Sequence, residues 1–140
     1  AILQLIALVT ACGNPPASPA IQAGDLRIQE AWGYPAVAGG TGVVFLTIDN
    51  ASSTPDRILG GSSVQATQVE LHATTQAMEQ AQMRPTSGIA LAPGRRTVLA
   101  PGGEHVMVIG LSTALQRGQV YTITLDFDRA PSVTIPWTIR

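Results

Sequence analysis

A two-residue alternation of apolar and polar side chains, interrupted by Gly and Pro, most constrains the fold of this chain. Residues 119–128 (QVYTITLDFD) alternate strictly, and residues 65–72 (QATQVELH) and 26–32 (LRIQEAW) alternate clearly, as half-buried strands do. Pro93-Gly94 and Pro101-Gly102 have the order that favours type II turns. With about eight to ten short strands and no helical period, the pattern predicts an all-β, antiparallel Greek-key sandwich. The pattern does not separate the cupredoxin kind from the immunoglobulin kind.

Further strands are predicted where β-branched and apolar residues cluster, in residues 43–50, 56–63, 95–100, 104–111 and 132–140. We expect His72 to lie at the far end of its strand. Residues 34–42 (YPAVAGGTG) are expected to form a loop. Residues 73–82 are polar and uneven, and their pattern allows either a short helical turn or a hairpin loop.

The first twelve residues resemble the end of a bacterial lipoprotein signal. Residues 1–11 (AILQLIALVTA) are mostly apolar, but the run is shorter than the ~20 residues of a membrane-spanning helix. It has the length of a signal-peptide core, and without an initiator Met or basic start we expect the sequence to begin inside the signal. Val9-Thr10-Ala11-Cys12 resembles a lipoprotein box, which would make Cys12 the lipidated first residue. The alternative is a core strand with a buried cysteine.

Residues 13–24 (GNPPASPAIQAG) are rich in Pro, Ala and Ser and are predicted to be a linker between that segment and the folded domain. Such a segment is extended and semi-rigid, at ~3.1 Å per residue or roughly 35 Å in all. It would hold the domain clear of a membrane surface. The predicted division is therefore a truncated signal and lipobox segment at residues 1–12, a linker at 13–24 and one β-sandwich domain at 25–140.

Charge and cysteine content exclude several classes of function. Only 12% of residues are charged and the net charge is -1, so no nucleic-acid-binding surface is expected. One cysteine, Cys12, rules out an intrachain disulfide, a CxxC redox pair and a cysteine zinc cluster. It also rules out a blue-copper centre in the domain, which requires a thiolate ligand.

The side chains that could bind a soft metal are confined to one stretch. Both histidines and all three methionines lie between His72 and Met107. Imidazoles and thioethers form a soft, uncharged ligand set that suits Cu(I) better than Zn(II), Mg(II) or Ca(II). His105 and Met107 are two residues apart on a predicted strand and would share one face. His72 and Met83 can complete the set if their segments neighbour that strand.

Each of these residues also has an ordinary structural interpretation. A lone Met in an apolar strand usually fills a core, and a lone His beside a turn is usually a surface residue. The clustering of all of them favours a metal site. Met78 is expected to pack within its loop, and Glu104 is expected to point away from His105. Neutral ligands leave the charge of the ion uncompensated and favour release, which suits a carrier better than a store.

The spacing of these four residues is similar to a known family motif. His-x10-Met-x21-His-x-Met, formed by His72, Met83, His105 and Met107, resembles the motif of the periplasmic copper chaperones called PCuAC. The similarity extends over about residues 31–140 and includes Ala31-Trp32, Val69-Glu70-Leu71-His72, Met83-Arg84-Pro85, Pro101-Gly102-Gly103, His105-Val106-Met107 and Gly110-Leu111.

The resemblance implies a cupredoxin-like β-sandwich or barrel with a solvent-accessible Cu(I) site. It implies delivery of copper to the CuA centre of cytochrome c oxidase, often with a Sco-type partner. Two departures stand out. Some members carry a His/Met-rich C-terminal tail that this sequence lacks, and many are soluble in the periplasm, whereas Cys12 suggests a lipid anchor at the cell envelope.

Three other functions compete with delivery. A hydrolase is disfavoured because neither a GxSxG nor an HExxH motif is present, so we do not expect an enzyme. A non-metal binding or adhesion module remains open, because a sandwich fold does not fix function. Copper buffering or resistance without delivery would use the same four ligands.

Overall fold

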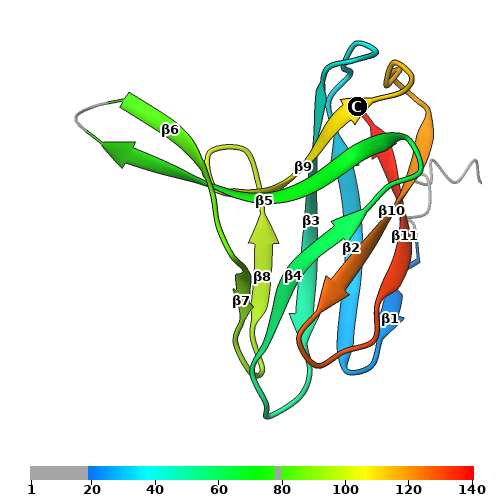
Figure 1. Ribbon diagram of the computed structural model, residues 1–140. Helices are drawn as coiled ribbons and strands as arrows, with labels where there is room; N and C mark the ends of the chain where they lie inside the picture. Colours follow the sequence, from blue (N-terminus) through cyan, green and yellow to red (C-terminus); the bar gives the residue numbers. More distant parts are fainter. Residues whose placement is uncertain (1–18, 78–79) are drawn as a thin grey trace, which may run out of the picture.

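The computed structural model describes residues 19–77 and 80–140, and this part of the chain is entirely β-structure with connecting turns (Figure 1). The all-β prediction is therefore confirmed. The strands are β1 (Ile21–Ala23), β2 (Leu26–Gly33), β3 (Thr41–Asn50), β4 (Asp56–Ser62), β5 (Ala66–Ala77), β6 (Gln80–Pro85), β7 (Ile89–Leu91), β8 (Arg96–Leu99), β9 (Glu104–Leu111), β10 (Val120–Phe127) and β11 (Val133–Ile139).

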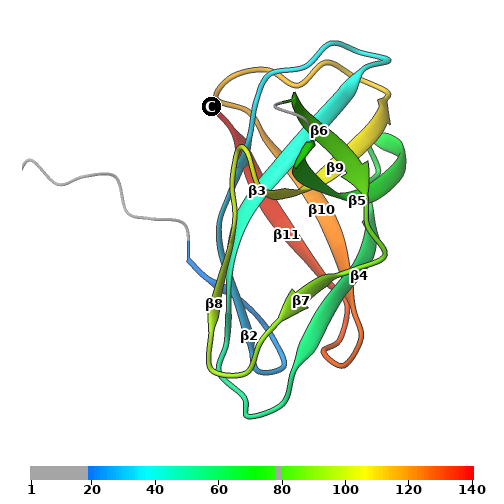
Figure 2. The same cartoon turned by 90° about the vertical axis from the view of Figure 1, so that its left-hand side faces the viewer.

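The strands form one strongly curled sheet. Its order is β6-β5-β9-β3-β2-β11-β10-β4-β7, with β1 added beside β2 and β8 beside β3. All pairings are antiparallel except the short contact of β11 with β2. The sheet curls round on itself, so that β4 comes into contact with β5 although the two are not neighbours in the sheet order (Figures 1 and 2).

The inward side of this curled sheet holds the hydrophobic core. Trp137, Ile48, Leu125 and Val106 are among its fully buried side chains, and each comes from a strand that the sequence predicts. Gly33 is required where β2 crosses the indole of Trp137, because a β-carbon there would lie 2.1 Å from the carbonyl oxygen of Val43 and 2.6 Å from the indole ring. The core therefore fixes β2 against β3, and β3 is the strand that pairs with β9.

The end predicted for the strand at residues 65–72, which is β5 in the structure, is wrong. His72 does not lie at a strand end, because β5 continues to Ala77 and β6 begins at Gln80. β5 and β6 thus pair as a β-hairpin, which includes the described residues of the range 73–82, and residues 78–79 lie outside the described part of the chain. Past Thr74, β5 pairs with β6 alone, and the hairpin extends away from the curled sheet (Figure 1). Without a core beneath it, nothing imposes a regular apolar alternation on this sequence.

The sheet also begins earlier than Asp25, the predicted start of the domain. β1 lies within the range predicted as linker, and its Ile21 and Ala23 pair with Ile28 and Leu26 of β2. Residues 1–18, which include the predicted lipobox and Cys12, lie outside the described residues. In the part of the chain that the structure describes, no helix has the length and apolar character needed to cross a membrane.

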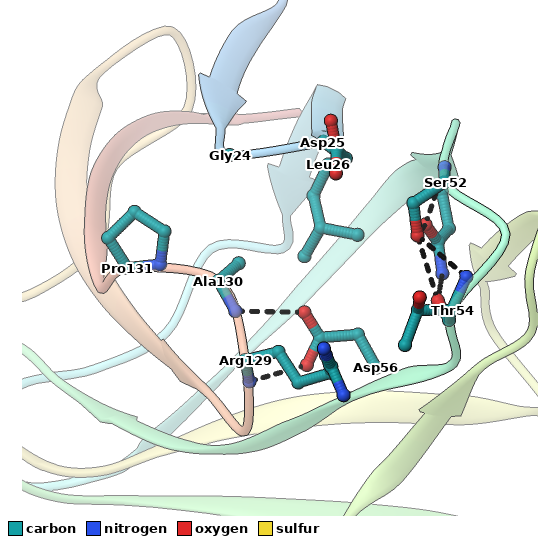
Figure 3. Close-up of a pocket in the computed structure, with 10 residues that line it drawn as sticks. Gly24, Asp25, Leu26, Ser52, Thr54, Asp56, Arg129, Ala130 and Pro131 are labelled. Atoms are coloured by element: carbon teal, nitrogen blue, oxygen red, sulfur yellow. Dashed lines mark hydrogen bonds between the residues drawn. The ribbon is translucent and has the colours of Figure 1, made fainter.

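Asp56 links the β3–β4 turn to the β10–β11 turn, at the end of the curled sheet remote from the β5–β6 hairpin. Its buried carboxylate accepts hydrogen bonds from the backbone N–H groups of Arg57 (2.8 Å), Arg129 (2.9 Å) and Ala130 (3.0 Å). Figure 3 shows the hydrogen bonds from Arg129 and Ala130. Burial alone would raise the pKa of Asp56, but the hydrogen bonds from Arg129, Arg57 and Ala130 outweigh it and hold the pKa below its usual value. The ionised carboxylate therefore stabilises the β10–β11 turn.

We predict that Asp56→Ala lowers the free energy of unfolding by roughly 1.5–3 kcal/mol at neutral pH, because three backbone donors lose a charged acceptor. Since the pKa of Asp56 is lower in the folded state, its contribution is present above about pH 4, the ordinary Asp value, and is lost as the pH falls through the folded value. Urea unfolding at pH 7 and pH 3 measures both effects.

The matched control is Asp128→Asn, which removes an exposed carboxylate from the same turn. It should change stability by less than about 0.5 kcal/mol. An Asp56→Ala protein as stable as this control at pH 7, or equally destabilised at both pH values, would contradict the role given to Asp56.

Candidate metal centre

His72 and His105 lie directly opposite each other on the adjacent antiparallel strands β5 and β9. Residues paired in this way point to the same face of a sheet. Their ring centroids are 5.7 Å apart with an angle of 31° between the ring planes. Both residues are buried, with exposed fractions of 9% and 3%. The structure therefore brings the two histidines of the sequence together at one point.

One nitrogen of each imidazole is hydrogen-bonded and the other has no partner. Nε2 of His72 lies 2.8 Å from Oε2 of Glu70, and Nδ1 of His105 lies 3.1 Å from the carbonyl oxygen of Gly103. Nδ1 of His72 and Nε2 of His105 are buried without a hydrogen-bond partner. A polar atom left in that state costs about 1–3 kcal/mol, so each ring carries a nitrogen that would gain from a ligand.

This arrangement is the one that metal-binding histidines usually adopt. A ligating histidine commonly donates its second ring N–H to a carboxylate or a backbone carbonyl, which fixes the orientation of the ring. Here the acceptors are Glu70 and Gly103. The 5.7 Å separation of the ring centroids lies within the span that two imidazoles bound to one ion can have at a typical metal–nitrogen distance of about 2.0–2.1 Å.

Met107 lies on the same strand and, by alternation, on the same face as His105. Its Cα is paired with that of Glu70 on β5 and with that of Val43 on β3, and the residue is half-buried. The predicted sharing of one face by His105 and Met107 follows from the regular register of β9. Among the described residues, no three or more His, Cys, Asp or Glu residues are grouped to hold a metal, so a four-ligand set here depends on the predicted thioethers.

Met83 lies on β6, where its Cα is paired with that of Thr74. Thr74 follows His72 by two residues, so this register assigns the Met83 position to the face of the sheet that carries the histidines. β6, β5 and β9 are consecutive in the sheet, which meets the condition that the segment of Met83 must neighbour the others. The side chain of Met83 and the whole of Met78 lie outside the described part of the chain.

Three aromatic residues, Trp32, Tyr34 and Phe45, form an aromatic wall whose Phe45 ring lies beside His105. The Phe45 ring lies 6.3 Å from the His105 ring, and the rings of Trp32 and Tyr34 lie 4.9 Å and 5.8 Å from that of Phe45. Glu30, at the bulge where the β2–β3 register shifts, has a φ of 55°, and the bulge directs the following Trp32 toward Phe45.

A pocket of about 420 Å³ opens beside His105. Tyr34, Val43, Phe45 and Thr74 line it together with the turn residues Pro101 and Gly102. This pocket gives an otherwise buried imidazole a route to solvent, and its lining is mainly apolar. The aromatic wall therefore limits the exposure of His105, and the pocket leaves this residue accessible from solvent.

Glu104 is exposed on the strand that carries His105. Its Cα is paired with that of Ala73, one position beyond the His72–His105 pair, so alternation assigns it to the opposite face.

Glu70 and the aromatic wall were not predicted as parts of the site. The alternation in Val69-Glu70-Leu71-His72 indicates that Glu70 shares a face with His72, so its place in the site could have been predicted. The three aromatic residues have no regular spacing in the sequence that would indicate a common position.

The chain is similar in sequence to a family of lipoproteins. The family described as "Putative lipoprotein LpqE-like" matches residues 26–139. A curated relative, "Putative lipoprotein Lxx21020" of Leifsonia xyli subsp. xyli (strain CTCB07), is 32% identical over 127 residues, which cover 88% of this chain and 76% of the relative.

Solved structures similar to this chain include a copper-bound PCuAC domain from PmoF2. It is 25% identical, with a TM-score of 0.75, over 88% of this chain and 98% of that domain. The solution structure of CuI-DR1885 from Deinococcus radiodurans is also 25% identical, with a TM-score of 0.58, over 86% of this chain and 80% of that protein.

The fold and the motif together define a cupredoxin-like domain of the PCuAC type, as predicted. The chain belongs to the LpqE-like family.

Proposed function

We propose that this protein binds one Cu(I) ion through His72, Met83, His105 and Met107 and acts as an extracytoplasmic copper chaperone. The observation that carries the proposal is the buried pair of facing imidazoles, each with one nitrogen unpartnered and the other oriented by an acceptor. The similarity to a copper-bound PCuAC domain and to CuI-DR1885 supports the choice of copper.

The ligand set favours Cu(I) over harder ions. Thioether sulfur is a soft donor that suits Cu(I), whereas Mg(II) and Ca(II) prefer oxygen ligands. Two imidazoles and two thioethers are neutral, so the complex keeps the positive charge of the ion. Such a site should release copper more readily than a site built from negatively charged thiolates. These properties suit a binding protein that transfers metal and does not act as an enzyme.

The proposed acceptor is the CuA centre of cytochrome c oxidase, reached directly or with a Sco-type partner. Support comes from the four-residue motif and from the position of His105 beside an open pocket. Copper that can reach solvent through such an opening can also reach the ligands of another protein. If no transfer occurs, the same site would serve copper buffering or resistance.

The proposed location is the outer face of the cell envelope, with the domain tethered through a lipidated Cys12. The lipobox-like Val9-Thr10-Ala11-Cys12 supports this, as does the lipoprotein description of the family and of the Leifsonia relative. The proline-rich residues that follow Cys12 would separate the domain from the lipid surface.

We predict one-to-one binding of Cu(I), measured by titration against a competing Cu(I) chelator, and only weak binding of Cu(II). A double variant, His105→Ala with Met107→Ala, should lose stoichiometric Cu(I) binding because two of four ligands are gone. Both residues lie on the face of β9 opposite to the buried Val106, so the variant should still fold, which circular dichroism checks.

The matched control is the double variant Thr124→Ala with Thr134→Ala, which removes a hydroxyl pair from the surface of β10 and β11. It should bind Cu(I) as the wild type does. If the His105/Met107 variant bound copper like this control, the assignment of ligands would be incorrect.

We predict that the Cu(I)-loaded protein transfers its ion to the apo CuA domain of a cytochrome c oxidase subunit from the same organism, alone or with a Sco-type protein present. The copper content of the acceptor domain, measured after the two proteins are separated, reports the transfer. Loaded protein that keeps its copper under both conditions would exclude delivery and leave the buffering alternative.

Lipidation of Cys12 is tested by mass spectrometry of the membrane fraction of cells that express the protein from its own gene. The wild type should carry a lipid on Cys12 and sediment with membranes, whereas Cys12→Ser should be unmodified and released. An unmodified wild-type Cys12 would contradict the anchor without affecting the copper site.

A further inference from the structure

Glu70 holds the His72 ring through a hydrogen bond that defines which ring nitrogen is free. An ionised carboxylate can only accept hydrogen bonds, so the proton of a neutral imidazole must be on the nitrogen that faces it. Oε2 of Glu70 lies 2.8 Å from Nε2 of His72, which assigns the proton to Nε2. The lone pair is then on Nδ1, the buried nitrogen that has no partner.

His105 has the opposite arrangement. A backbone carbonyl oxygen is also an acceptor only, and that of Gly103 lies 3.1 Å from Nδ1 of His105. The proton is therefore on Nδ1, and the lone pair is on the buried, unpartnered Nε2. The two facing rings thus use different tautomers, each set by its own acceptor.

The Glu70 carboxylate is itself oriented by a neighbour. Gln68 donates its side-chain N–H to Oε1 of Glu70, leaving Oε2 for His72. Gln68, Glu70 and His72 are alternate residues of β5 and share one face. Because the side chain of Glu70 is only 31% exposed and that of His72 only 11%, water competes poorly for this hydrogen bond.

We propose that Glu70 is a positioning residue, which keeps His72 in its Nε2–H tautomer and so presents Nδ1, together with Nε2 of His105, to the metal. The proposal rests on the proposed function for the identity of the metal, but the tautomers are a property of the metal-free protein. Carboxylates that orient ligating histidines commonly change metal affinity by about 10- to 100-fold when removed.

The experiment measures tautomers and copper affinity in the same set of variants. Two-bond ¹H–¹⁵N correlation spectra of the metal-free protein should show an unprotonated Nδ1 for His72 and an unprotonated Nε2 for His105. In Glu70→Ala, His72 should become a mixture of tautomers while His105 is unchanged. Cu(I) affinity should fall by about 10- to 100-fold, as for other residues that orient metal-bound histidines.

Two further variants separate positioning from charge and from general structural damage. Glu70→Gln offers a neutral oxygen acceptor to Nε2–H, so it should keep the His72 tautomer and lose less affinity than Glu70→Ala. Glu104→Ala removes an exposed carboxylate from the opposite face of neighbouring β9 and should change neither readout.

Several results would overturn the proposal. These are a wild-type His72 protonated on Nδ1, a Glu70→Ala protein with unchanged tautomer and affinity, or a Glu70→Gln protein that keeps the tautomer but binds as weakly as Glu70→Ala. The proposed function fails in a distinguishable way, because a wild type with the expected tautomers and no Cu(I) binding would contradict copper carriage and leave the orienting role of Glu70 intact.

Discussion

The pairing of β5 with β9 is the constraint on which the candidate site depends. It places His72 opposite His105 and Glu70 opposite Met107. A slip of one residue in this register would move one strand's set of side chains to the other face of the sheet, and the two imidazoles would no longer meet. No loop has to close and no disulfide is needed, because the site is built by backbone pairing.

The opposite face of the same two strands stabilises this register. Leu71 and Val106 are paired across β5 and β9 and are almost completely buried, at 3% and 0% exposure. Burying an aliphatic side chain of this size contributes about 1.5–3 kcal/mol. Any slip would expose these residues and bury polar ones, so the apolar core on one face positions the histidines on the other.

The sequence predicted most of this arrangement because its strands alternate where they cover a core. Because alternate residues of a strand share a face, the strand predicted at residues 104–111 indicated that His105 and Met107 lie together. The resemblance of the motif to the PCuAC family implied that His72 lies near them. The aromatic wall could not be predicted, since Trp32, Tyr34 and Phe45 meet only through a register shift between β2 and β3. The extension of β5 to Ala77 was missed because the hairpin has no core-facing side to impose alternation.

The geometry of the site is consistent with binding and release of a soft ion. Glu70 and Gly103 orient the two imidazoles through hydrogen bonds within the fold, so part of the cost of ordering ligands is met on folding. The pocket beside His105 leaves a route for exchange. The remaining ligands, Met83 and Met107, are predicted from the motif, and Met83 comes from the projecting hairpin.

X-ray absorption at the copper K-edge of the Cu(I)-loaded protein tests the central claim most directly. We predict one copper ion with two imidazole nitrogen and two sulfur neighbours, and loss of one sulfur in Met107→Leu. A spectrum that lacks sulfur scatterers, or that is unchanged in Met107→Leu, would contradict the proposed site.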